Sequence, residues 1–229
     1  MLEAVIFDLD GTIIALMLPL NKMRNDTKKF YLEKGLPPHL LDSTDGISSS
    51  TMKAREYFRN DGMSEEEWQQ LQKEVDVVLN KHESDAASEV RLLDGARSVV
   101  QSVSDMGLKT AILTNNGREA VDRILDQIDV EHLFDVIQTR NESPNPKPFP
   151  DGLLRVLERL DVQPQEAVYV GDATIDAEAA KRANIPFWGV ATGEVKKEDL
   201  LEAGAEEVFD ELKEILPALR KQLNGLVSS

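Results

Sequence analysis

A short apolar segment near the start of the chain, residues 4–7, leads directly into Asp8-Leu9-Asp10-Gly11-Thr12. A run of this length, bounded by a glycine, is typical of a strand that is buried on both faces in a parallel sheet. Open α/β sheets bind their ligands beyond the carboxyl ends of the strands. We therefore expect Asp8 to lie at the functional edge of such a sheet. Asp10, two residues later, points to the same side as Asp8 if the chain stays extended.

Two neighbouring carboxylates repel each other unless a cation or a shared proton lies between them. The pair therefore indicates either a bound metal or a raised pKa. An ionised aspartate can attack an electrophilic phosphorus atom without a helper base. A second carboxyl group can protonate a leaving oxygen and later deprotonate a water molecule. The alternative is that Asp8 and Asp10 only end a strand and begin a turn.

Composition excludes several classes of function. The 229 residues include 42 acidic and 26 basic side chains, which gives a formal net charge of −16, so we expect no binding to nucleic acid or anionic membranes through general electrostatics. The absence of cysteine excludes disulfides, thiolate zinc sites and a cysteine nucleophile. We expect the three histidines, His39, His82 and His132, to lie at the surface. There is no stretch of membrane-spanning length and no signal-peptide pattern, so we expect a cytoplasmic protein.

Residues 16–91 contain no convincing strand pattern. Apolar residues recur at helical spacing over about 20–31, 52–58 and 68–79, and Ser64 followed by Glu67 is a capping-box signature. We expect an all-helical domain inserted into a core domain that comprises residues 1–15 and 92–229. Lys53 and Arg55 in the insertion could meet a substrate carboxylate or hydroxyl, but we favour a solvated helix face for both.

From residue 92 onward, segments of strand and helix type alternate. Turn residues follow several of them, as at 115–117. This alternation predicts an α/β fold, a Rossmann-like doubly wound parallel sheet with helices on both faces. The expected strands are 109–114, 135–138, 167–172, 187–190 and 207–209, and the expected helices are about 96–106, 120–128, 153–160, 175–183 and 211–223.

Three of the expected strands end in polar residues: Asp8, Thr114 and Asp172. In a parallel sheet these three strand ends share one edge. Thr114 and Asn115 could donate hydrogen bonds to a phosphoryl oxygen, and Lys147, in a proline-rich loop, could supply positive charge. Asp172 with Asp8 and a carbonyl group would form an oxygen-rich site suited to Mg²⁺.

Asp176 stands one helical turn after Asp172 and could orient a metal-bound water molecule. Each of these residues also has an ordinary explanation. Thr114 and Asn115 could belong to a turn, and Lys147 could be a solvated loop residue. Asp172 and Asp176 could be N-cap and surface residues of the helix that follows. The combination of all these residues in this order is much less expected by chance than any one of them alone.

Together these segments resemble the haloacid dehalogenase-like hydrolase superfamily. Its four motifs occur in order as Asp8-Leu9-Asp10-Gly11-Thr12, Thr114-Asn115, Lys147-Pro148 and Gly171-Asp172-Ala173-Thr174-Ile175-Asp176. The resemblance implies that Asp8 is the nucleophile that forms an aspartyl-phosphate and that Asp10 is the general acid and base. It implies that Thr114 and Lys147 position the phosphoryl group and that Mg²⁺ binds Asp8, the Asp10 carbonyl and Asp172. The helical insertion resembles the family's cap, which excludes water from the site.

The resemblance also limits the reactions that we expect this chain to catalyse. Relatives that cleave carbon–halogen bonds lack a carboxylate at the place of Asp10, so its presence implies a phosphate ester. The layout is most similar to phosphoglycolate phosphatases and β-phosphoglucomutase-like phosphatases, which implies a Mg²⁺-dependent phosphatase of a small phosphomonoester, such as phosphoglycolate or a sugar phosphate. Residues 14–17, Ile-Ala-Leu-Met, depart from the acidic or serine residues that often follow the first motif. A phosphomutase is the alternative. A phospho-aspartate receiver module is a more distant one, because it would be shorter and lack the insertion.

Overall fold

The computed structural model describes residues 1–15 and 18–224. The chain divides into two compact units, one formed by Met1–Leu16 with Glu89–Ser229 and the other by Met17–Ser88. The sequence placed the limits of the insertion at residues 16 and 91 instead. Leu16 and Met17, which we expected in an apolar connector, lie outside the described residues.

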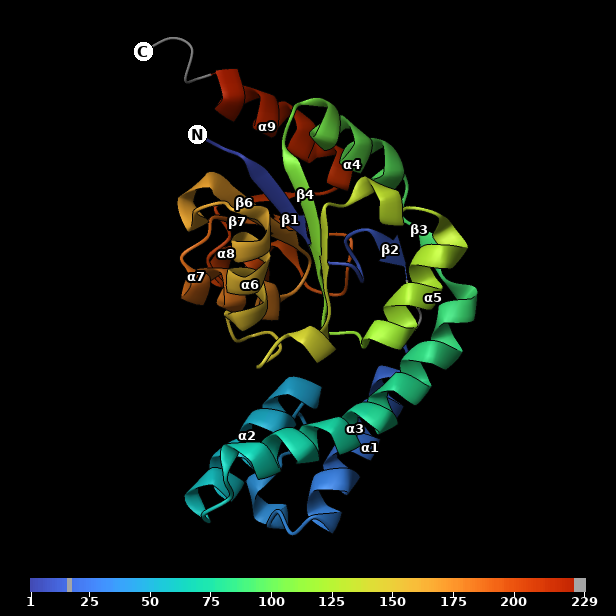
Figure 1. Ribbon diagram of the computed structural model, residues 1–229, viewed down its shortest axis with the longest axis vertical. Coiled ribbons are helices and arrows are strands. Elements are labelled where there is room, and N and C mark those ends of the chain that lie inside the picture. The colour runs from blue at the N-terminus through green and yellow to red at the C-terminus, as the bar shows by residue number, and fades with distance from the viewer. Residues whose placement is uncertain (16–17, 225–229) are drawn as a thin grey trace. The chain divides into compact units, whose positions relative to one another are not determined.

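The first unit is built on a six-stranded parallel sheet with the order β5-β4-β1-β6-β7-β8 (Figure 1). Strand β1 lies at the centre, and each of its four residues is completely buried. This is the environment expected for an apolar run that is covered on both faces. The predicted parallel sheet is confirmed. Its strands are β1 (Ala4–Phe7), β4 (Lys109–Leu113), β5 (Val136–Gln138), β6 (Ala167–Gly171), β7 (Phe187–Val190) and β8 (Glu207–Phe209).

Helices cover the sheet, because alternate side chains of each strand point to opposite faces and both faces are apolar. Ile6, Leu113 and Phe187 form one core cluster with side chains of α6, α7 and α8, which Figure 1 shows grouped together. Helix α4 packs on β4 and contacts α9. The helices of this unit are α4 (Ala96–Asp105), α5 (Arg118–Ile128), α6 (Asp151–Leu160), α7 (Thr174–Ala183), α8 (Lys197–Glu202) and α9 (Ile215–Asn224).

A second, two-stranded sheet joins the segments on either side of the second unit, which we call the helical unit. Strand β2 (Ile14–Ala15) pairs antiparallel with β3 (Arg91–Leu92), with Ile14 opposite Leu92. The sequence predicted neither strand. Two residues are too few for a periodic pattern, and the pairing depends on a partner far away in the chain.

The second unit consists of α1 (Leu20–Glu33), α2 (Ile47–Asn60) and α3 (Glu65–Ala86), with no strand among its described residues. Its core includes Tyr31, Phe58 and Trp68, and the rings of Tyr31 and Trp68 stack with their centroids 6.3 Å apart. The predicted capping box at the start of α3 is present, because Ser64 and Glu67 exchange hydrogen bonds. None of the helices described in the chain is long and apolar enough to cross a bilayer.

The histidine predictions need one correction. His39 and His132 are exposed as expected, but His82 is buried, with its Nε2 2.8 Å from Asp26 Oδ2. Helix α3 continues beyond the predicted stripe, and three residues after Leu79 the same face presents His82. The polar sequence around His82 concealed this continuation.

The Lys53 side chain is engaged within the helical unit. Its Nζ lies 2.8 Å from Asp42 Oδ2 and 2.7 Å from Asp45 Oδ2. These bonds raise the pKa of Lys53. Desolvation acts to raise the pKa of Asp45, but hydrogen bonds from Lys53, the Asp42 N–H and Ser49 outweigh it and lower that pKa. The charge of Lys53 is therefore largely balanced by neighbours on the preceding loop.

Candidate active site

Three adjacent strands end in residues that the sequence analysis singled out. Asp8 follows β1, Thr114 follows β4 and Asp172 follows β6, and β1 lies between the other two strands. The Asp8 N–H still donates to the Val170 carbonyl at 2.8 Å, so the ladder extends to the edge. The parallel topology thus brings the three positions to one end of the sheet.

The ammonium group of Lys147 lies inside a buried polar cluster. Its Nζ is 2.6 Å from Asp8 Oδ1, 2.6 Å from Asp176 Oδ1 and 3.0 Å from the Tyr169 hydroxyl. All four side chains are buried, so solvent and salt screen their charges only weakly. Burial alone would lower the pKa of Lys147, but the charges of Asp176 and Asp8 outweigh it and raise that pKa above its usual range. Lys147 is therefore a permanent cation beside Asp8.

The same cluster is rich in carboxylate oxygens. Asp8, Asp172 and Asp176 each offer an oxygen, and these oxygens lie within 4.8 Å of one another. Burial, together with the charges of Asp8 and Asp176, raises the pKa of Asp172 to about 9. Burial also raises the pKa of Asp8 to about 6, against the opposing charge of Lys147. Three carboxyl groups around one ammonium leave an excess of acidic oxygens, a donor set that fits a divalent cation such as Mg²⁺.

Asp10 is linked to the end of β4 through Asn116. Asn116 Nδ2 donates to Asp10 Oδ2 at 2.6 Å, and the Asn116 N–H donates to Thr114 Oγ1 at 3.1 Å. Both Asn116 and Thr114 are buried. The sequence predicted only a turn at Asn116, so its contact with Asp10 was missed.

Asn115 holds the main chain of Lys147. Its Nδ2 donates to the Lys147 carbonyl, and its Oδ1 accepts from the Lys147 N–H, both at 2.9 Å. Arg140 Nη1 in turn donates to the Asn115 carbonyl at 2.5 Å. The side-chain amide that we expected to face a phosphoryl oxygen thus positions the lysine loop. Substrate binding by Asn115 stays a prediction.

Asp176 is completely buried. Its Oδ1 accepts from Lys147 Nζ at 2.6 Å and from the Tyr169 hydroxyl at 2.9 Å, and its Oδ2 accepts from the Ala173 N–H at 3.1 Å. We expected Asp176 to orient a water molecule, but protein donors contact both of its oxygens. One of these donors is the hydroxyl of Tyr169, a residue that the sequence predicted only as part of an apolar strand.

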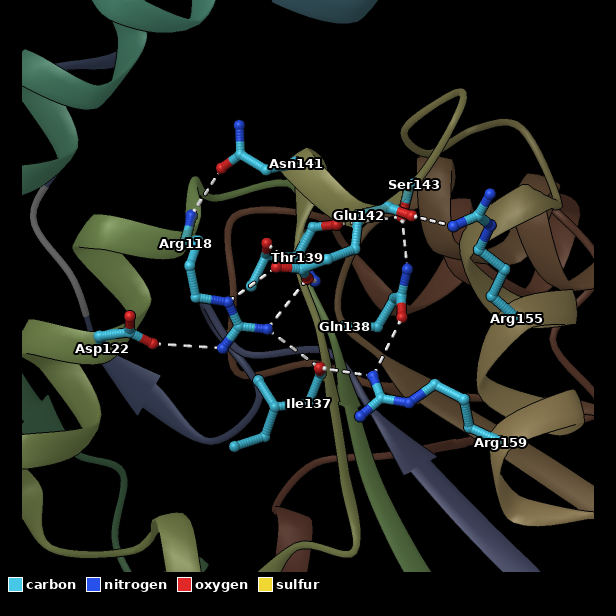
Figure 2. A network of polar contacts seen from close by, with 10 residues as sticks. All are labelled: Arg118, Asp122, Ile137, Gln138, Thr139, Asn141, Glu142, Ser143, Arg155 and Arg159. Carbon is cyan, nitrogen blue, oxygen red and sulfur yellow. Dashed lines mark hydrogen bonds and ion pairs between the residues drawn. The ribbon is translucent and has the colours of Figure 1, made fainter.

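The loop between β5 and α6, which carries Lys147, is anchored at its start by a network around Arg118 (Figure 2). Arg118 Nε and Nη2 lie 2.8 and 2.9 Å from the Glu142 carboxylate, and Nη2 also donates to the Ile137 carbonyl. Glu142 accepts from the N–H and hydroxyl of Thr139 at 2.7 and 2.8 Å. The network therefore fixes the start of this loop to α5 and β5.

Comparison with known proteins agrees with the family resemblance of the four motifs. Residues 5–190 match the haloacid dehalogenase-like hydrolase family. A phosphoglycolate phosphatase from Colwellia psychrerythraea is 26% identical over 224 residues, covering 96% of this chain and 97% of that protein.

Two solved structures share the fold. A hydrolase from Pseudomonas syringae has a TM-score of 0.66 at 22% identity, covering 96% of this chain and 98% of that one. A candidate beta-phosphoglucomutase from Thermotoga maritima has a TM-score of 0.61 at 28% identity, covering 96% of this chain and 99% of that one. Because the family match extends from β1 to β7 and includes all four motifs, the chain belongs to the haloacid dehalogenase-like hydrolase family.

Proposed function

We propose that this chain is a Mg²⁺-dependent phosphatase that hydrolyses a small phosphomonoester through an aspartyl-phosphate on Asp8. The observation that carries this proposal is the buried Asp8 carboxylate at the end of the central strand, 2.6 Å from Lys147 Nζ and within one carboxylate cluster with Asp172. A nucleophile held beside a fixed cation is suited to attack a negatively charged phosphoryl group.

In the first half of the proposed reaction, an Asp8 oxygen forms a bond to phosphorus as the ester P–O bond breaks. Asp10 donates its proton to the leaving oxygen, which departs as an alcohol. Thr114 and Lys147 bind phosphoryl oxygens through a hydroxyl and an ammonium group. Asn116 orients Asp10 for this transfer through its 2.6 Å hydrogen bond.

In the second half, the Asp10 carboxylate removes a proton from water. The resulting hydroxide attacks the aspartyl-phosphate, inorganic phosphate leaves, and Asp8 and protonated Asp10 are regenerated. Asp8, Asp172 and the main-chain carbonyl of Asp10 are the groups that would hold Mg²⁺. When bound, this ion supplies positive charge that offsets the charge of the phosphoryl group.

The name of one relative supports a proposal for the substrate class. The Colwellia relative is named a phosphoglycolate phosphatase, so a small acid such as phosphoglycolate is the first candidate and a sugar phosphate the second. We propose that the helical unit has the role of the family's cap, which the resemblance of the insertion supports.

The deciding experiment is phosphate release from phosphoglycolate, sugar phosphates, nucleotides and an aryl phosphate, with and without Mg²⁺ after treatment with a chelator. Asp8→Asn should abolish release, and mass spectrometry should detect a phosphorylated protein in the wild type only. Asp161→Asn, at an exposed position after α6, is the matched control and should keep full activity. Mg²⁺-dependent release by Asp8→Asn at the wild-type rate would contradict the proposal.

A phosphomutase is the second candidate, because the Thermotoga structure at 28% identity is a candidate beta-phosphoglucomutase. A mutase returns the phosphoryl group to a sugar hydroxyl, so its aspartyl-phosphate must resist water. Interconversion of sugar monophosphates that outpaces phosphate release would favour the mutase. Fast phosphate release with no isomer formed would exclude it.

A further inference from the structure

The loop that follows β7 lies against the carboxylate of Asp172. We call Ala191, Thr192 and Gly193 the 191–193 loop. Strands β6 and β7 are parallel neighbours, so this loop leaves the sheet beside the position where Asp172 leaves β6. Its start is fixed to β8, because the Ala191 N–H donates to the Phe209 carbonyl at 2.8 Å.

Gly193 has no room for a side chain. A Cβ atom built on Gly193 would lie 1.7 Å from Asp172 Oδ2 and 2.7 Å from its Cγ, and the third nearest atom is Asp172 Cβ at 3.1 Å. All three of these nearest atoms belong to the Asp172 side chain. The space that any other residue at this position would need is the space that the Asp172 carboxylate occupies.

A second glycine confines the same carboxylate. A Cβ atom on Gly11 would lie 2.3 Å from Asp172 Oδ2, so the Asp172 carboxylate is held between Gly11 and Gly193. The two glycines are also connected, since Thr192 Oγ1 donates a hydrogen bond to the Gly11 carbonyl. The first motif and the 191–193 loop therefore enclose Asp172 together.

The two glycines differ in what they require. Gly11 has φ +77°, a left-handed conformation that disfavours any side chain regardless of space. Gly193 lies outside that region, so alanine can adopt its backbone conformation. Substitution at Gly193 therefore tests the contact with Asp172 without adding backbone strain.

We propose that the 191–193 loop is part of the metal site and that Gly193 is a positioning residue, which sets the Asp172 carboxylate in the orientation that faces Asp8 and Asp176. This inference rests on the proposed Mg²⁺ site. A methyl group at Gly193 displaces the Asp172 oxygen, and the oxygens that now lie within 4.8 Å of one another lose their common orientation. Thr192 supports the arrangement by fixing the loop to Gly11.

The test is Mg²⁺ binding by isothermal titration calorimetry on chelator-treated full-length protein, with no substrate present. Gly193→Ala should weaken Mg²⁺ binding about tenfold or more, an effect of the size usually seen when the surroundings that orient a metal ligand are disturbed. Thr192→Val should weaken it by a smaller factor. Gly46→Ala is the matched control, because a Cβ atom there would meet only Ser49 Oγ at 4.0 Å, and it should bind Mg²⁺ as the wild type does.

Circular dichroism and the melting temperature check that each variant is folded. If Gly193→Ala does not fold, Thr192→Val decides, and wild-type affinity in that variant overturns the inference. Wild-type affinity in a folded Gly193→Ala protein overturns it as well, while leaving the proposed phosphatase intact. A wild-type protein that binds no Mg²⁺ overturns both, since the proposed function also requires the ion.

Discussion

The hydroxyl of Tyr169 lies 3.0 Å from Lys147 Nζ, and it is also 2.9 Å from Asp176 Oδ1. The ammonium group can donate to this oxygen, and the hydroxyl can donate to the carboxylate. Tyr169 is completely buried, so bulk solvent does not compete for these hydrogen bonds. Tyr169 thus helps to hold the cation that faces the proposed nucleophile.

We predict that Tyr169→Phe lowers kcat about tenfold while the protein stays folded. Loss of the hydroxyl removes hydrogen bonds to two charged groups, worth about 1.5–3 kcal/mol each where the partner is charged, and leaves Lys147 less well fixed. Steady-state kinetics on the best substrate of the panel measures the change. An unchanged kcat would show that Asp8 and Asp176 position Lys147 without the tyrosine.

Tyr31→Phe is the matched control for this prediction. Tyr31 is also completely buried, and its hydroxyl bonds to Thr51 at 3.1 Å and Gln72 at 3.0 Å within the helical unit. This variant should lower the melting temperature but leave kcat unchanged. A similar loss of kcat in both variants would indicate a general effect of stability.

We predict that Asp10→Asn slows the first step, transfer of the phosphoryl group to Asp8, far more for alkyl phosphates than for an aryl phosphate. An alkoxide needs a proton to leave and an aryl oxide does not, and loss of a general acid typically costs about 10²–10⁴-fold. The second step also needs Asp10, so the aryl ester should give a burst of phenol followed by slow turnover. Rapid-mixing kinetics measures the burst, and turnover without one would argue against Asp10 as the base.

We predict that Asn115→Ala weakens inhibition by inorganic phosphate. The substitution removes both 2.9 Å hydrogen bonds to the Lys147 main chain, each worth about 1 kcal/mol, so the ammonium group is less well placed for an anion. Asn145→Ala is the control in the same loop, because Asn145 Nδ2 bonds to Asp151 instead. Equal inhibition constants for the two variants would contradict a specific role of Asn115.

We predict that the Glu142 carboxylate stabilises the folded protein at neutral pH and loses this effect in acid. Burial acts to raise the pKa of Glu142, but hydrogen bonds from Arg118 and Thr139 outweigh it and lower the pKa. A carboxyl group with a lower pKa in the folded state contributes its full stability above its unfolded pKa, and the contribution disappears as the pH falls through the folded pKa.

The measurement is the melting temperature of the wild type and Glu142→Gln from pH 7 to pH 3. The wild type should be more stable at pH 7, by about 1 kcal/mol or less because the Arg118–Glu142 pair is partly exposed to solvent. The difference should shrink in acid. A constant difference would mean that packing, and not charge, accounts for the effect of the substitution.

The sequence predicted the sheet and much of the candidate site because both depend on local patterns. Apolar runs that end in polar residues located Asp8, Thr114 and Asp172, and repeated βα units supplied the parallel topology that brings them together. Lys147 was proposed as a cation in a proline-rich loop and gained support from its motif, but nothing in the surrounding sequence indicates that this loop returns to the end of β1.

The missed residues are those whose role depends on distant partners. Tyr169 fits a buried strand pattern, and only the folded sheet places its hydroxyl beside Lys147. Asn116 fits a turn pattern, and only the end of β1 gives it Asp10 as a partner. Gly193 is an ordinary loop glycine until Asp172 is found against it.

The pairing of Ile14 with Leu92 means that the chain leaves the α/β unit and returns to it at the same two-stranded sheet. For that unit, residues 17–88 are the loop of a hairpin. The entropy of closing a loop grows only with the logarithm of its length, and this loop has a core of its own. A change in the length of this insertion should therefore alter the closure entropy only slightly, and each of the two units has a core of its own to preserve.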